Sequence, residues 1–130
     1  CVTGLVIAVL LILPVGIVAV GSGSGLIPLP YEMFLLAERM PLLFRAHMIT
    51  SALALLLLPA VIMSRRKPQQ HRMLGRVVGA FVVVGGLTAL PVAIFSESSV
   101  IARTGFFLQG IVWLALFAVD RAARRLGLDA

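Results

Sequence analysis

A single basic segment, Ser64–Arg76 (SRRKPQQHRMLGR), separates two long apolar runs, and this pattern most narrows what the chain can fold into. Five of the eleven Lys and Arg residues lie in it: Arg65, Arg66, Lys67, Arg72 and Arg76. The flanking sequence is so apolar that 61% of the chain is hydrophobic and its mean hydropathy is +1.12. A core of 130 residues cannot bury that much apolar surface, so we expect the chain to use a lipid bilayer as its solvent.

Four apolar runs are candidates for membrane-spanning helices, and the last of them continues into Asp120–Arg125. At about 1.5 Å per residue, roughly 20 apolar residues cross a hydrocarbon core of about 30 Å. The sequence therefore predicts an all-α membrane protein, in which a single domain of residues 1–130 forms a bundle of four transmembrane helices arranged as two helical hairpins. The predicted spans are about Val2–Val20, Leu42–Met63, Met73–Phe95 and Thr104–Val119.

The segment between the first two predicted spans carries two further signals. Gly21–Gly25 (GSGSG), followed by Pro28 and Pro30, is typical of a flexible turn that ends the first helix. Tyr31–Met40 (YEMFLLAERM) mixes charged and apolar side chains, which predicts a short amphipathic helix at the membrane surface. Pro41 favours a break between this helix and the second span.

The start of the chain has two interpretations. A sequence that begins at Cys1 rather than Met indicates an incomplete or trimmed N-terminus, and a lipidated Cys is the alternative. The run Val2–Val20 lacks a small-residue cleavage site at its end, so we interpret it as a retained span rather than a signal peptide. With one Cys, the chain cannot form an internal disulfide bond.

The distribution of Lys and Arg predicts the orientation of the spans. Short cytoplasmic loops are enriched in these residues. If the basic segment is cytoplasmic, eight Lys and Arg residues lie inside and three, Arg39, Arg45 and Arg103, lie outside. This predicts a multi-pass protein of the bacterial cytoplasmic membrane with both termini cytoplasmic. The formal net charge of +6 is explained by this pattern, so we do not expect nucleic-acid binding.

The third span carries small residues at helical spacing, and these predict a helix-packing face. In lipid, helices associate by close approach of their backbones, which small side chains permit. The face could pack within this chain, which would make the third span the central helix, or it could receive a helix of another membrane-protein subunit. The predicted packing residues are Gly75, Gly79, Gly86, Ala89 and Ala93.

A few polar side chains lie in the outer half of the predicted spans. They are His47, Thr50, Ser51, Thr88 and Gln109. Polar groups within a bilayer usually point into the protein and find partners there. One interpretation is a hydrogen-bonded cluster that joins three helices. The other is a ligand, quinone or proton site around His47 and Gln109, with Thr50 in support.

The positions of the two histidines limit which metal-containing cofactors the chain could bind. His47 lies sixteen residues before Met63, or about 24 Å along a helix, whereas His71 begins the next span at the inner surface. The two cannot ligate one haem within a single copy of the chain, although His47 with a ligand from elsewhere stays open. Two His and no Cys pair predict no metal site.

The basic segment itself is expected to serve as the cytoplasmic anchor and to attract anionic lipids. His71, with Gln69 and Gln70, is expected to meet free N–H groups at the start of the third span or lipid phosphates.

The motif His71-Arg72-x-x-Gly75-Arg76-Val77, preceded by His47 and the basic segment, resembles the bacterial membrane proteins grouped as domain-of-unknown-function family 2306. Thr104-Gly105-Phe106-Phe107, Trp113 and the ending Ala122–Arg125 fit the same pattern, so the resemblance covers about residues 42–125. It implies a fold of four or more spans and singles out His47 and His71, and it implies no known activity.

The sequence holds no Ser-His-Asp set, phosphate-binding loop or paired carboxylates within a span, so we do not expect an enzyme. The preferred hypothesis is a non-catalytic accessory subunit of a larger bacterial membrane complex, of the respiratory or photosynthetic kind. One alternative is a haem- or quinone-linked redox protein that uses His47. Another is a small transporter or lipid-binding protein.

Overall fold

The computed structural model describes residues 2–127, with side chains at Val6 and from residue 9 onward. Within this range the chain is helical and contains no strand. Cys1 lies outside the described residues. The elements are α1 (Val2–Ser24), α2 (Tyr31–Arg39), α3 (Pro41–Met63), a 3-10 turn η1 (Ser64–Arg66), α4 (Pro68–Phe95) and α5 (Val100–Arg125).

Three helices are long and apolar enough to cross a membrane: α3 together with η1, α4 and α5. Many large apolar side chains of α4 and α5 are exposed, as with Ile101 (87% exposed) and Leu116 (63%). Exposed apolar surface of this extent is compatible with contact to lipid. These features indicate a helical protein whose long helices are compatible with a membrane. The part of α1 with described side chains, Val9–Ser24, is a shorter apolar helix, so the fourth predicted span stays a proposal.

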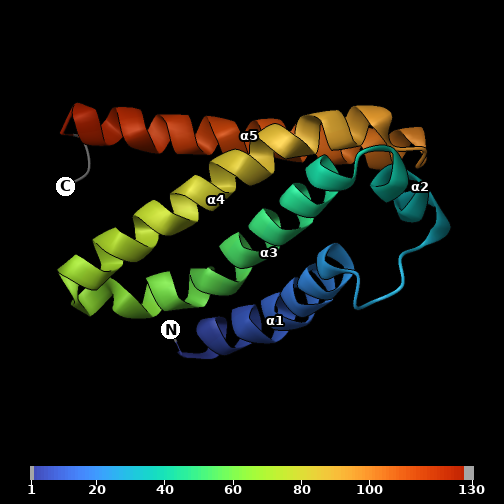
Figure 1. Cartoon of the computed structure of the whole chain (residues 1–130). Coiled ribbons are helices and arrows are strands. Elements are labelled where there is room, and N and C mark those ends of the chain that lie inside the picture. The colour runs from blue at the N-terminus through green and yellow to red at the C-terminus, as the bar shows by residue number, and fades with distance from the viewer. Residues whose placement is uncertain (1, 128–130) are drawn as a thin grey trace.

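The long helices lie in a row in chain order (Figure 1). Helix α1 packs against α3, α3 against α4, and α4 against α5. Within the described chain, α5 has no comparable packing against α1 or α3. Helix α4 is thus one of the two inner helices of the row, together with α3. The predicted four-span bundle of two hairpins stays a proposal, and α3 and α5 each pack on α4 without closing on each other.

The end of α1 corrects the sequence prediction. Gly21–Ser24 continue the helix instead of forming the turn, which comes at Gly25 (φ +83°). The reason is packing on α3: a Cβ added at Gly23 would lie 2.9 Å from Met48 Cβ. Close backbone contact between two helices thus outweighs the weak helix propensity of glycine and serine.

The basic segment is helical rather than a loop. Only Lys67 separates η1 from α4, and Pro68 occupies the first turn of α4, where its missing N–H costs no helical bond. Arg72 and Arg76 therefore lie on α4, which begins five residues earlier than predicted. Similarly, α5 begins at Val100 because the Ser99 hydroxyl accepts a hydrogen bond from the Ala102 N–H, at 3.3 Å.

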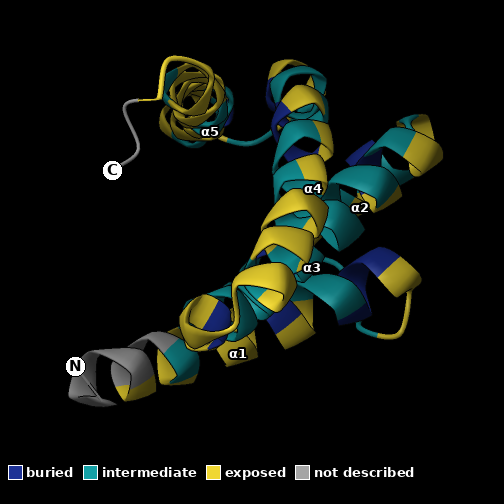
Figure 2. Ribbon diagram, turned by 90° about the vertical axis from the view of Figure 1, so that its left-hand side faces the viewer, coloured by how far each residue is buried: buried dark blue, intermediate teal, exposed yellow. Residues whose placement is uncertain are grey.

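The predicted short helix before Pro41 is present as α2. It packs on α3 through the buried side chain of Leu36, and its opposite face is exposed (Figure 2). An ion pair between Arg39 and Glu97, 2.7 Å apart, ties α2 to the turn between α4 and α5. Both side chains are about half exposed or more, so the pair adds at most about 1 kcal/mol.

Candidate functional site

A strip of small residues on α4 allows α3 and α5 to approach it closely. Gly85 faces α3, and a Cβ added there would lie 2.8 Å from Ser51 Oγ. Gly86 faces α5, where an added Cβ would lie 2.9 Å from Leu114 Cγ and 3.5 Å from the carbonyl oxygen of Gly110. Larger side chains at these two positions would force the helices apart.

Most of the predicted packing residues lie on this strip. Ala89 and Ala93 are buried, and Gly79 lies against Phe117 of α5. Gly75 differs from the others: it is exposed, and nothing in the described chain lies within 4 Å of a Cβ added there, so it does not pack within this chain. Gly85 and, across on α5, Gly110 also lie in these close contacts and were not predicted as packing residues.

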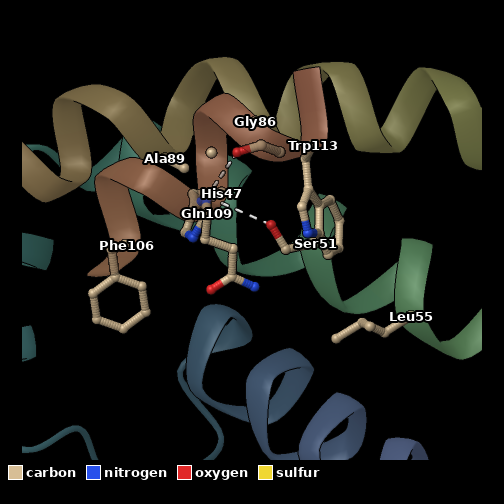
Figure 3. A pocket seen from close by; sticks show the side chains of 10 residues that line it. His47, Ser51, Leu55, Gly86, Ala89, Phe106, Gln109 and Trp113 are labelled. Atoms are coloured by element: carbon tan, nitrogen blue, oxygen red, sulfur yellow. Dashed lines mark hydrogen bonds between the residues drawn. The ribbon is translucent and has the colours of Figure 1, made fainter. Parts of the chain in front are cut away.

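A cavity of about 190 Å³ lies above this strip, between α3 and α5 (Figure 3). Gly85, Gly86 and Ala89 form its floor, and their small or absent side chains leave space above α4. The cavity exists since α3 and α5 both pack on α4 but not on each other. Its walls come from His47, Ser51 and Leu55 on α3, and from Phe106, Gln109 and Trp113 on α5.

His47 is fixed to α4 through one edge of its ring. Its Nδ1 lies 3.1 Å from the carbonyl oxygen of Gly85, with Thr88 Oγ1 at 3.4 Å and Ser51 Oγ at 3.5 Å. The Thr88 hydroxyl is directed elsewhere, since it lies 2.7 Å from the carbonyl oxygen of Val84. A carbonyl oxygen can only accept, so Nδ1 carries the hydrogen and donates it to Gly85.

The other ring nitrogen of His47, Nε2, has no hydrogen-bond partner among the described residues. In the same part of the chain, every buried side-chain nitrogen or oxygen has a partner. Nε2 is therefore at least partly exposed, and the His47 ring that carries it lines the cavity.

The structure brings together two of the three residues predicted for a ligand site. His47 and Gln109 line the same cavity, whereas Thr50 does not, because its hydroxyl donates to the carbonyl oxygen of Ala46 at 2.6 Å. Ser51, one residue further along α3, takes the position expected of Thr50. The aromatic walls, Phe106 and Trp113, were missed as site residues; with Gln109 they follow a spacing of three and four residues, which marks one helix face.

His71 has a structural role at the opposite end of the same helix pair. Its Nδ1 donates to the carbonyl oxygen of Val61 at 3.0 Å, and the Ser64 hydroxyl donates to the same oxygen at 2.8 Å. The ring therefore meets a carbonyl near the end of α3, rather than the N–H groups at the start of α4. Each histidine thus bonds the backbone of the neighbouring helix, one near each end of the α3–α4 pair.

No family model, curated protein or solved structure matches this chain. The resemblance to family 2306 therefore stays a prediction. Among residues 2–127, no three His, Cys, Asp or Glu side chains lie together as metal ligands would.

A second cavity, of about 340 Å³, lies between the facing ends of α4 and α5, near Ile94 and Phe107. The guanidinium of Arg103 lies beside it and donates to two carbonyl oxygens, those of Ala93 (Nε, 3.1 Å) and Ile94 (Nη2, 2.6 Å). Arg103 therefore caps the end of α4, where helix carbonyls lack N–H partners and favour a positive charge.

Proposed function

We propose that this chain is a membrane protein that binds a small aromatic ligand of the quinone class in the cavity between α3 and α5. The observation that carries the proposal is the unpartnered Nε2 of His47, on a ring that lines the same cavity as Gln109 and two aromatic side chains. Small-molecule sites typically combine apolar and aromatic walls with a few polar groups that orient the ligand.

The size of the cavity favours a single ring over a haem. A dry cavity of about 150 Å³ is enough to hold benzene, and this one measures about 190 Å³. A haem macrocycle is several times larger than one aromatic ring. Of the two cofactors considered from the sequence, the cavity thus supports the quinone and gives no support to haem.

The ligand would come from the bilayer. Phe106 and Gln109 line the cavity and are also exposed on the outer surface of α5. Because α3 and α5 do not close on each other, a ring could lie between them while an apolar tail stays in the lipid. An amide exposed on an otherwise apolar helix face is costly in lipid unless something pairs with it.

Trp113 is the one tryptophan of the chain and lines the cavity, so its fluorescence reports on the site directly. The purified protein would be titrated with an alkylated benzoquinone and, separately, with the matching hydroquinone. We expect at least one of them to change the Trp113 emission saturably, and His47→Leu to weaken that binding about tenfold or more. Thr50→Val is the matched control on α3 and should bind as the wild type does.

A signal that rises linearly with either ligand, without saturation and equally in His47→Leu, would show partition into the detergent and contradict the proposal.

We also propose four spans with both termini on the cytoplasmic side of a bacterial cytoplasmic membrane. The start of α1, the α3–α4 connection and the end of α5 lie at one end of the molecule, with α2 at the other (Figure 1). The basic residues of Ser64–Arg76 and of the end of α5 therefore gather at one end, which supports a cytoplasmic location for it and contact with anionic lipids. At about 1.5 Å per residue, the 23 residues of α1 are long enough to cross.

Cysteine labelling would test this topology. In a Cys1→Ser background, we expect an impermeant maleimide to label Glu38→Cys on intact cells and to leave Gln70→Cys unlabelled. Changing Arg65, Arg66, Lys67, Arg72 and Arg76 together to Gln should let Gln70→Cys react in part of the population, because the charge difference that sets orientation is then lost. Labelling of Gln70→Cys in the unaltered background would reverse the proposed orientation.

An accessory subunit of a larger membrane complex is the second proposal. The observation that favours it is the position of α5, which within the described chain packs only against α4 and leaves Gly105 open, with nothing within 4 Å of an added Cβ. An exposed helix with an open glycine suits a neighbouring transmembrane helix. A stable monomer purified in mild detergent without a partner would count against it.

A further inference from the structure

The hydrogen bond from His47 to Gly85 decides what kind of ligand atom the cavity can recognise. A neutral imidazole has one N–H and one lone pair. Because Nδ1 donates its hydrogen to the carbonyl oxygen of Gly85, 3.1 Å away, the lone pair is on Nε2. In the described part of the chain no ion pair involves His47, so no carboxylate is in place to hold a second proton on the ring.

The reachable nitrogen of His47 is therefore a hydrogen-bond acceptor. A ligand satisfies it only by donating a hydroxyl or N–H hydrogen. A quinone has carbonyl oxygens, which are acceptors, and placing one against Nε2 would set two lone pairs facing each other. A hydroquinone or an alkylphenol has the hydroxyl that Nε2 requires.

We infer that the cavity binds the reduced, hydroxyl-bearing form of its ligand, a hydroquinone or alkylphenol, in preference to the oxidised quinone. The inference rests on the proposed function and names the substrate class of the same site. The phenolic hydroxyl donates to His47 Nε2, and the ring lies among the apolar and aromatic walls.

Gln109 does not discriminate between the oxidised and the reduced ligand. Its amide holds both a donor group and an acceptor oxygen, so it can pair with either redox form of a second ligand oxygen. Within the described chain, the Gln109 amide makes no hydrogen bond that would fix its orientation. The preference for a hydroxyl donor therefore depends on His47, whose ring is held in place by α4.

The test compares three ligands that share one ring and one alkyl chain: the hydroquinone, the quinone and the dimethyl ether of the hydroquinone. Their dissociation constants would be measured by calorimetry on the full-length protein in detergent, with a reductant present only for the hydroquinone. We expect the hydroquinone to bind at least about tenfold more tightly than the other two, since only it can donate to Nε2. In His47→Leu the three affinities should converge.

The other outcomes distinguish a failure of this inference from a failure of the proposed function. If the quinone or the dimethyl ether binds as tightly as the hydroquinone, the inference is wrong while the ligand site stands. If the hydroquinone preference survives unchanged in His47→Leu, the acceptor is another group and the inference is again wrong. If none of the three binds, the proposed function falls, and the inference with it.

Discussion

Leucine in place of Gly85 is expected to destabilise the fold by about 1–3 kcal/mol, the usual cost of overpacking a close contact. A Cβ at this position would already lie 2.8 Å from Ser51 Oγ and 3.6 Å from Ser51 Cα and N. The remaining carbons of leucine would have to push α3 away from α4, and the carbonyl oxygen of Gly85 would move out of reach of His47. Thermal unfolding in one fixed detergent, followed by helical circular dichroism, measures the effect.

The matched control is Gly75→Leu on the same helix. Nothing lies within 4 Å of a Cβ at Gly75, and the residue is exposed. Leucine has the better helix propensity, so this variant should be as stable as the wild type or more stable, by up to about 1 kcal/mol. Equal destabilisation by both variants would mean that Gly75 is also covered, and a fully stable Gly85→Leu would contradict the α3–α4 packing.

The comparison of these two glycines shows what could be predicted from the sequence. The existence of the long apolar helices follows from hydropathy alone, because a bilayer imposes their length and composition. Which face of a helix meets a neighbour depends on how the helices cross. The run of small residues from Gly75 to Ala93 therefore predicted a packing face, but not that its first residue would have no neighbour within 4 Å of an added Cβ.

The helix boundaries were harder to predict than the helices themselves, because packing between helices and the position of a residue within a turn decide where a helix begins and ends. The sequence GSGSG and the proline at position 68 are turn signals when they stand alone. Contact with α3 keeps Gly21–Ser24 helical, and placement in the first turn makes Pro68 a helix start instead of a break. Both corrections depend on tertiary packing or on the position within a turn, which composition does not report.

The candidate site was predicted only in part. Counting residues gives the depth of a side chain in the membrane, but it does not give the direction in which that side chain points from its helix. His47 and Gln109 could be placed in the same half of the membrane by counting residues, and the structure puts them in one cavity. Thr50 was chosen over Ser51 without a way to fix the rotation of α3. Residues four apart share a helix face more closely than residues three apart, and Ser51 is the fourth residue from His47. The open gap between α3 and α5 has no signature in the sequence.

The two nitrogens of His47 are expected to have separable roles, one in holding the helices and the other in binding the ligand. Asparagine places an amide N–H close to the position of Nδ1 and has no atom at the position of Nε2. His47→Asn should therefore keep the hydrogen bond to Gly85 and unfold at nearly the wild-type temperature, yet bind the preferred ligand about tenfold more weakly or worse. The measurements are thermal unfolding and calorimetric titration on the same sample.

His47→Leu is the matched variant that removes both nitrogens. It should lose the ligand as His47→Asn does and, in addition, lose about 0.5–1.5 kcal/mol of stability, the usual net value of one hydrogen bond. Full ligand binding by His47→Asn would show that Nε2 is not the recognition atom. An unfolding temperature for His47→Asn as low as that of His47→Leu would show that the bond to Gly85 had not been replaced.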